Sequence, residues 1–436
     1  MKTVPSSPFA AYYNHMMNLT EFATRYYEAM FSASIRTMEV LSGMERDELN
    51  KKKIQNVTRA TFDALFREML KKEDFCKSLS KLMDSYVDYA TYFHFDKIYR
   101  NYEAYLEFLD SFVEPIRDSV NRTPADVIKM DGRFDLHHYR SSIKPKYTTP
   151  ILVVGSLINR HYILDLLPQI SIIRYLQNIG FDVYATDWRT PTARDVGVNL
   201  ETYAHDFLEN AVDKVEEITG SKQVTLFGYC WGGIFALIYS ALHPKDVKNL
   251  ILHATPVDLG NTTSVIEFWT KSLNVEKFVD AFGNVPPSFL NIAFLMRNPL
   301  EAYLKYFYYF DRPRTTDEII KFFSVEFWLY DSVPIIGKAF EKIIEDIYKD
   351  NLLINNKMKL GMQHVNLNNI MMPVLNIVGT KDDLVPPESC RTTTNVIPSK
   401  DKQIIEFPTG HVGLCISSDA HEKLWPKVGN WLVERS

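Results

Sequence analysis

The sequence has few cysteines and no long apolar run. A pair of cysteines in CxxC spacing is absent, so neither a disulfide framework nor a cysteine-ligated structural zinc site is expected. No apolar stretch approaches the ~20 residues needed to span a bilayer, and the N-terminus lacks the apolar core of a signal peptide. We therefore expect a reducing, cytoplasmic location. The four cysteines are Cys76, Cys230, Cys390 and Cys415.

The sequence also lacks an excess of basic charge. Its 49 lysines and arginines face 54 aspartates and glutamates, for a formal net charge of −5, so nothing indicates nucleic acid as a partner. Apolar residues are plentiful at 46% of the 436 residues. At about 100–200 residues per domain, this length predicts two or three folding units with a sizeable core.

The N-terminal part of the chain shows no strand pattern. Between Phe75 and Phe93, apolar and aromatic side chains recur every three or four positions, which predicts one face of a helix. We expect a helical domain over residues 1–122 that packs this face on itself or on the next domain. A docking surface for a partner helix or an apolar particle is the alternative. Pro115 and Pro124 mark the boundary.

Residues 123–436 alternate short apolar strands with amphipathic helices, which predicts a mainly parallel α/β sheet. Residues 259–365 break this alternation with aromatic-rich helical sequence, where we expect an inserted helical cap over the carboxyl edge of the sheet, and no strand. The expected strands lie within residues 134–139, 149–155, 182–188, 224–227, 248–256, 371–379 and 403–407.

The stretch Val224–Pro244 combines an apolar strand, a tight turn and an apolar helix. Cys230 stands at the apex of the turn, flanked by Gly228, Gly232 and Gly233, in the small-x-nucleophile-x-small pattern of a nucleophile elbow. The glycines permit a strained backbone and a close approach of strand and helix. The N-terminus of the helix favours the thiolate. Taken alone, Cys230 could equally be a small buried residue.

Two later loops supply an acid and a base. Asp382, in GTKDDLVPP, and His411, in FPTGHVGLC, each follow a strand, in the order nucleophile, acid, base that is typical of the α/β-hydrolase fold. The spacing G-x-x-D-x-x-V-P favours Asp382 over Asp383. We therefore predict an α/β-hydrolase fold with a Cys-His-Asp triad, in which His411 takes the proton of Cys230 and Asp382 holds the imidazole.

The oxyanion of such a reaction needs two backbone N–H donors. Trp231, directly after the nucleophile, supplies one, and Ile158, in the loop after the 149–155 strand, supplies the other. A thiol exchanges one thioester for another at little energetic cost, which favours acyl transfer to an alcohol over hydrolysis.

Neither a cofactor nor a metal is expected. The remaining histidines lack a metal-ligand spacing with carboxylates on one helix face, so we expect them to be structural or exposed. They include His137, His138, His161, His205, His243, His253 and His364.

From about Thr123 to its C-terminus, the sequence resembles the polyhydroxyalkanoate synthases. The resemblance lies in SLINRHYILDL, FDVYATDWRTP, GYCWGG, HPKDVKNLILHATPVDL, FWLYDSVP, GTKDDLVPP and TGH. These motifs separate the chain from dienelactone hydrolases, which are shorter and also carry a cysteine elbow. In detail it is most similar to the synthases that pair a catalytic chain with a separate helical subunit (class III-like).

The resemblance implies an acyltransferase that polymerises (R)-3-hydroxyacyl-CoA, such as 3-hydroxybutyryl-CoA, with release of CoA. It implies that Cys230 carries the acyl or polymer chain and that His411 deprotonates it. Asp382 would assist His411 and, in some proposals, activate the 3-hydroxyl group. Family members dimerise and sit on polyester granules, which implies a cytoplasmic homodimer on a granule surface, with a helical partner subunit as an option.

Two residues depart from the family pattern. Asp383 stands where many members have histidine, and Trp231 where many have a smaller or polar residue. The N-terminal helical region is longer than in the two-subunit synthases and shorter than in the single-chain ones. Two other functions remain open. One is a thioesterase or polyester depolymerase on the same scaffold, and the other is a non-catalytic granule-coating protein, against which the complete triad argues.

Overall fold

The computed structural model describes residues 17–18, 21, 77, 81, 122–130, 134–192, 195, 197–260, 265–297 and 315–436. The chain divides into two compact units, residues 1–97 with 267–282, and residues 98–266 with 283–436. The helical domain expected over residues 1–122 lies almost wholly outside the described residues and stays a prediction. In the first unit, the described elements include α9 (Val275–Phe282) and most of α8 (Val265–Ser272).

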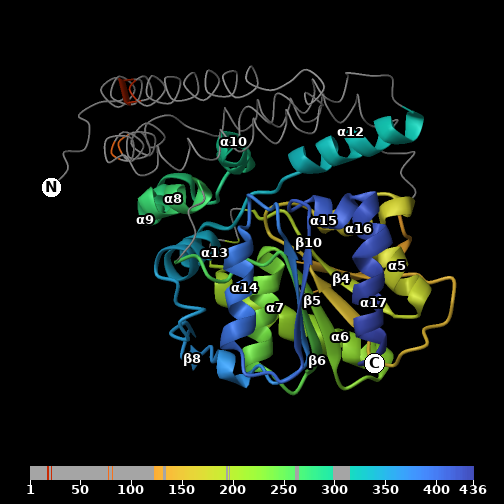
Figure 1. Ribbon diagram of the computed structural model, residues 1–436. Coiled ribbons are helices and arrows are strands. Elements are labelled where there is room, and N and C mark those ends of the chain that lie inside the picture. Colours follow the sequence, from red (N-terminus) through yellow and green to blue (C-terminus); the bar gives the residue numbers. More distant parts are fainter. Residues whose placement is uncertain are drawn as a thin grey trace, which may run out of the picture. The chain divides into compact units, whose positions relative to one another are not determined.

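The second unit is built around an eight-stranded sheet in the order β1-β2-β4-β3-β5-β6-β9-β10 (Figure 1). Strand β2 pairs antiparallel with β1 and β4, and every other neighbouring pair is parallel. The prediction of a mainly parallel sheet is therefore confirmed. The strands are β1 (Ala125–Lys129), β2 (Phe134–Tyr139), β3 (Ile151–Val154), β4 (Val183–Trp188), β5 (Val224–Tyr229), β6 (Val247–His253), β9 (Val374–Gly379) and β10 (Lys402–Phe407).

Helices cover both faces of this sheet, with α7 and α14 on one side and α5 and α17 on the other (Figure 1). The central strands are therefore mostly apolar, and every residue of β3, β5 and β9 is buried, including the polar Thr225 and Asn376. Parallel strands end at the same edge, so the loops after β3, β5, β9 and β10 meet there. These helices are α5 (Ile172–Ile179), α7 (Trp231–Leu242), α14 (Pro387–Val396) and α17 (Trp425–Val433).

Local sequence sets the ends of several helices. Helix α5 ends at Gly180 (φ 110°) and α6 (Leu208–Thr219) at Gly220 (φ 71°), because glycine adopts the left-handed conformation that closes a helix. Helix α6 continues directly from a π-helical turn, η5 (Thr202–Phe207). The remaining short elements are η2 (His161–Asp165), η3 (Pro168–Ile170), η7 (Leu367–Asn369), α15 (Gly413–Ile416) and α16 (Ser418–Lys423).

The part of the cap that belongs to the second unit is helical where the structure describes it, but it ends in a small hairpin of β7 and β8. The expectation that this region contains no strand was wrong, because Gly361 (φ 52°) permits the tight turn of a two-residue hairpin loop. The elements are α10 (Pro287–Arg297), α12 (Thr316–Tyr330), α13 (Gly337–Lys342), η6 (Ile343–Lys349), β7 (Lys359–Leu360) and β8 (Gln363–His364). No helix in the described residues is long and apolar enough to cross a membrane.

Candidate active site

Cys230 lies in the turn between β5 and α7, at the carboxyl edge of the sheet. Its backbone has φ 54° and ψ −123°, a strained conformation for any residue with a side chain. Two hydrogen bonds hold it there: the Cys230 N–H donates to the carbonyl of His253 at 2.9 Å, and the Gly233 N–H donates to the carbonyl of Cys230 at 2.9 Å. The strand-turn-helix expected around this cysteine is present.

The three glycines of the turn leave no room for a side chain. A Cβ on Gly228 would stand 2.3 Å from the Cα of Gly233, and one on Gly232 would stand 2.0 Å from the carbonyl oxygen of Val154. A Cβ on Gly233 would stand 1.9 Å from Oγ1 of Thr255. The elbow is therefore packed directly against β3 and the segment after β6, and this contact fixes the cysteine at the end of the strand.

His411 and Asp382 come from the loops after β10 and β9. Nδ1 of His411 lies 2.7 Å from Oδ2 of Asp382. The other carboxylate oxygen accepts the N–H groups of Leu384 at 3.0 Å and Val385 at 2.8 Å. With both carboxylate oxygens held, the His411 ring is fixed, and its Nε2 is left for Cys230. The structure thus brings together the three residues of the predicted triad.

The charges around His411 favour its protonated form. Burial of the ring would lower its pKa, but the Asp382 carboxylate, the Cys230 sulfur and the hydrogen bonds that the ring donates to both outweigh that effect and raise the pKa to about 10. A proton that leaves the Cys230 thiol is therefore held well by the imidazole. This arrangement suits a thiolate–imidazolium pair.

The other described cysteines are poor nucleophiles. Cys390 and Cys415 are buried, and burial raises the pKa of both thiols well above the ordinary value. His253 is fully buried beside the triad, and burial, followed by the neighbouring His411, lowers its pKa to about 3, so its ring stays neutral. Of the three described cysteines, Cys230 is the one paired with a base.

The two predicted oxyanion donors differ in their surroundings. Trp231 is the first residue of α7, so its N–H has no partner within the helix and points out of the helix end. The N–H of Ile158 donates to Oγ of Ser156 at 3.3 Å. Rotation of the Ser156 side chain about its Cα–Cβ bond would move Oγ away and release the second donor.

The cap contacts the loops at this edge of the sheet. The indole N–H of Trp231 donates to the hydroxyl of Tyr348 in η6 at 3.0 Å. The indole N–H of Trp328, at the end of α12, donates to the carbonyl of Arg160 at 2.8 Å, and the Tyr162 hydroxyl donates to Asp331 at 2.6 Å. Cys230 and His411 are only 6% and 7% exposed beneath these contacts. The bulky Trp231 therefore fastens the elbow to the cap.

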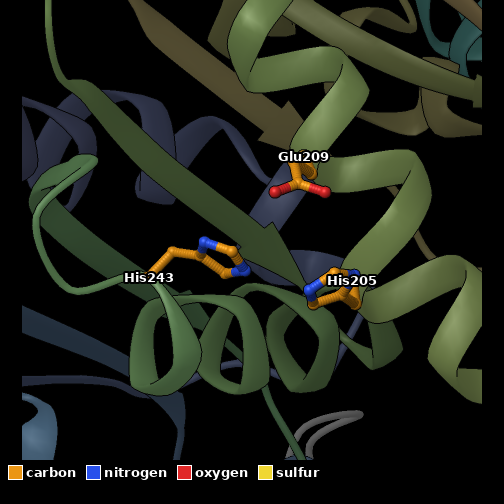
Figure 2. A group of neighbouring side chains, drawn as sticks. All are labelled: His205, Glu209 and His243. Carbon is orange, nitrogen blue, oxygen red and sulfur yellow. The ribbon is translucent and has the colours of Figure 1, made fainter.

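One group of side chains corrects the expectation for the remaining histidines. The donor atoms of His205, Glu209 and His243 all lie within 4.8 Å of one another (Figure 2), close enough for a shared metal ion. His205 and Glu209 are four residues apart on continuous helix, a spacing that the sequence itself shows. His243 directly follows a different helix, α7, so sequence spacing could not place it beside them.

Two sequence profiles match the chain. The profile described as "alpha/beta hydrolase fold" matches residues 149–415, more than half of the chain. The profile described as "Poly-beta-hydroxybutyrate polymerase (PhaC) N-terminus" matches residues 107–176. The first match agrees with the strand order and the elbow and confirms the predicted fold class.

Several curated proteins named "Poly(3-hydroxyalkanoate) polymerase subunit PhaC" are similar to this chain. The protein of Haloferax mediterranei is 38% identical over 73% of this chain and 65% of its own length, so the similarity spans just under two thirds of that relative. The protein of Allochromatium vinosum is 35% identical over 72% of this chain and 89% of its own. That of Synechocystis is 31% identical over 77% of this chain and 93% of its own.

Proposed function

The chain belongs to the poly(3-hydroxyalkanoate) polymerase family, and from this we propose that it polymerises (R)-3-hydroxyacyl-CoA, with 3-hydroxybutyryl-CoA as the substrate, by covalent catalysis on Cys230. The observation that carries the proposal is the strained elbow cysteine hydrogen-bonded to a histidine whose other nitrogen is held by Asp382. Acyl transfer from a thioester requires a nucleophile and a base that activates it, and Cys230 and His411 can supply these two groups.

In the first step, Nε2 of His411 takes the proton of the Cys230 thiol. The sulfur attacks the carbonyl carbon of the acyl-CoA, a new C–S bond forms, the C–S bond to CoA breaks, and the proton on His411 passes to the departing sulfur. The N–H groups of Trp231 and Ile158 stabilise the oxyanion between these events. Loss of one such donor typically lowers the rate by ~10²–10³.

In the second step, the 3-hydroxyl group of another hydroxyacyl unit attacks the thioester on Cys230. His411 takes the hydroxyl proton, the ester C–O bond forms, the C–S bond breaks, and the proton returns to the cysteine sulfur. Both oxygens of Asp382 already accept hydrogen bonds from His411, Leu384 and Val385. This supports a role for Asp382 in orienting His411 rather than as a second base for the hydroxyl group.

The burial of the site supports transfer over hydrolysis. Cys230 and His411 are almost completely covered, and the cap is tied to the elbow through Trp231 and Tyr348. Exclusion of water protects the acyl-enzyme until a hydroxyl group of the substrate arrives. A polymer that grows on Cys230 would keep the protein at the surface of a polyester granule, where we expect it to act as a homodimer, with or without a helical partner subunit.

Two products of one assay test this proposal. The purified full-length chain is incubated with 3-hydroxybutyryl-CoA, and both free CoA and acid-insoluble polyester are measured, with Cys230→Ala as the control. Polyester formed together with CoA by the unchanged chain, and neither by the variant, is the expected result. CoA release with soluble 3-hydroxybutyrate would instead identify a thioesterase, and release by the Cys230→Ala variant would overturn covalent catalysis on this residue.

A further inference from the structure

Outside the catalytic site, two histidines and a glutamate face one another at a junction of two helices. His205 lies in the π-helical turn η5, Glu209 in the first turn of α6, and His243 directly after α7. Their donor atoms all lie within 4.8 Å of one another. Figure 2 shows the two imidazole rings and the carboxylate turned toward a common space. The site is independent of the function proposed above.

The local backbone sets this geometry. His205 and Glu209 are four residues apart along continuous helix, so they share one face. The π-helical turn at His205 is an uncommon element that is often found at functional sites. Metal–ligand bonds of about 2.0–2.2 Å place ligand atoms roughly 3.3–4.2 Å apart, which small side-chain rotations reach from the observed separations.

Each imidazole already has a carboxylate at its Nδ1 atom. Nδ1 of His205 lies 2.8 Å from Oδ1 of Asp206, and Nδ1 of His243 lies 3.6 Å from Oδ2 of Asp246. A carboxylate hydrogen-bonded to one ring nitrogen, as at His205, fixes the ring so that the other nitrogen can bind a metal. Nε2 of His243 is buried and has no hydrogen-bond partner in the described part of the chain. A buried nitrogen without a partner is costly unless a ligand satisfies it.

The charge around the group is negative. Glu209, Asp213 and Asp246 all act electrostatically on His243, and no lysine or arginine among the described residues forms an ion pair with Glu209. Tyr239 stacks on the His243 ring at 4.6 Å and holds its orientation. Such a site attracts a cation and repels an anion.

We propose that His205, Glu209 and His243 bind a divalent transition-metal ion of the zinc type. Two imidazoles and one carboxylate suit zinc and its neighbours, whereas magnesium and calcium prefer oxygen ligands throughout. Cys230 lies at the other end of α7, whose 12 residues at ~1.5 Å per residue separate the two sites by about 18 Å. The ion therefore ties the start of α6 to the end of the nucleophile-bearing helix and has no part in the chemistry.

Cobalt(II) is the probe for the test, because its visible absorption reports its ligands. The full-length chain, treated with a chelator and freed of it, is titrated with Co²⁺. We expect one equivalent to bind with visible bands of a nitrogen and oxygen site and without the sulfur-to-cobalt band that binding at Cys230 would give. His243→Gln and Glu209→Gln should each weaken binding at least tenfold. His364→Gln, an exposed histidine far along the chain in β8, is the matched control and should bind as the unchanged chain does.

Thermal unfolding provides the second readout. The melting temperature of the unchanged chain and of His364→Gln should rise with added Zn²⁺, because an ion that binds the folded state stabilises it, whereas that of Glu209→Gln should not. Absence of a cobalt site would overturn the proposal, and so would an affinity in both Glu209→Gln and His243→Gln equal to that of the unchanged chain. A cobalt spectrum dominated by a sulfur ligand would do the same.

Discussion

Replacing Asp382 by asparagine tests the electrostatics of the triad. The side chain keeps its shape, and Oδ1 can still accept the N–H groups of Leu384 and Val385. In that orientation the new NH₂ group faces Nδ1 of His411 and donates a hydrogen bond to it. In the unchanged chain the direction is opposite, because the carboxylate accepts a hydrogen bond from Nδ1. The imidazole then carries its proton on Nε2, the nitrogen that has to receive the proton of Cys230. The substitution therefore reverses the tautomer that the mechanism requires.

The magnitude follows from the pKa of His411. The rise from 6.5 to about 10 corresponds to at most about 5 kcal/mol of preference for the protonated ring, at ~1.36 kcal/mol for each tenfold change in proton affinity. Asp382 and Cys230 share this effect. Since the folded-state pKa lies above the unfolded one, the stabilisation is complete below about pH 6.5 and is lost as the pH rises toward 10.

Two measurements follow for Asp382→Asn. The kcat/KM for CoA release should fall by ~10³–10⁴, as expected when a catalytic histidine is held in the wrong tautomer. Denaturant unfolding at pH 6.5, 8 and 10 should show a smaller loss of stability with rising pH than the unchanged chain shows. Asp383→Asn is the matched control in the same loop and should change neither quantity strongly. If Asp382→Asn kept activity within tenfold and the full pH dependence, this account of the triad would be wrong.

Three further substitutions probe the surroundings of the site. Cys230→Ala should abolish both CoA release and labelling by a radioactive acyl-CoA substrate, whereas Cys415→Ala should retain labelling; equal labelling of the two variants would contradict the assignment of the nucleophile. Gly232→Ala forces a Cβ to 2.0 Å from a backbone carbonyl oxygen and should destabilise the fold by ~3 kcal/mol or more, seen as a lower melting temperature, with an unchanged value arguing against the packing described. Trp231→Phe removes the hydrogen bond to Tyr348 and should cost about 1 kcal/mol; a double-mutant cycle with Tyr348→Phe that shows no coupling would refute that contact.

The central sheet could be predicted from sequence because burial leaves a simple pattern. Strands β3 and β5 lie under helices on both faces, so β3 is apolar throughout and Thr225 is the one clearly polar side chain of β5. The elbow could also be predicted, because its glycines are required by the fold. A Cβ added to Gly228, Gly232 or Gly233 would lie only 1.9–2.3 Å from a neighbouring atom. At these positions the residue type that the packing of the fold requires is also the one that marks the element in the sequence.

Elements whose form depends on distant neighbours could not be predicted. Strand β1 has the sequence ADVIK and is mostly exposed at the edge of the sheet, so it lacks an apolar signal and exists through its pairing with β2. The proximity of His243 to His205 and Glu209 depends on how α7 packs beside η5 and α6. The hydrogen bond from Ile158 to Ser156 depends on loop geometry that no motif specifies.

Trp231 offers an optical reporter that needs no label. Its main chain stands at the site of reaction, while its indole is held beneath η6 by Tyr348. Any displacement of the cap would remove this hydrogen bond and expose the ring to water, so the emission of a variant that keeps Trp231 as its single tryptophan would shift as the substrate enters. A stopped-flow fluorescence trace of that variant would therefore give the rate at which a hydroxyacyl-CoA enters the site, for comparison with the rate at which CoA is released.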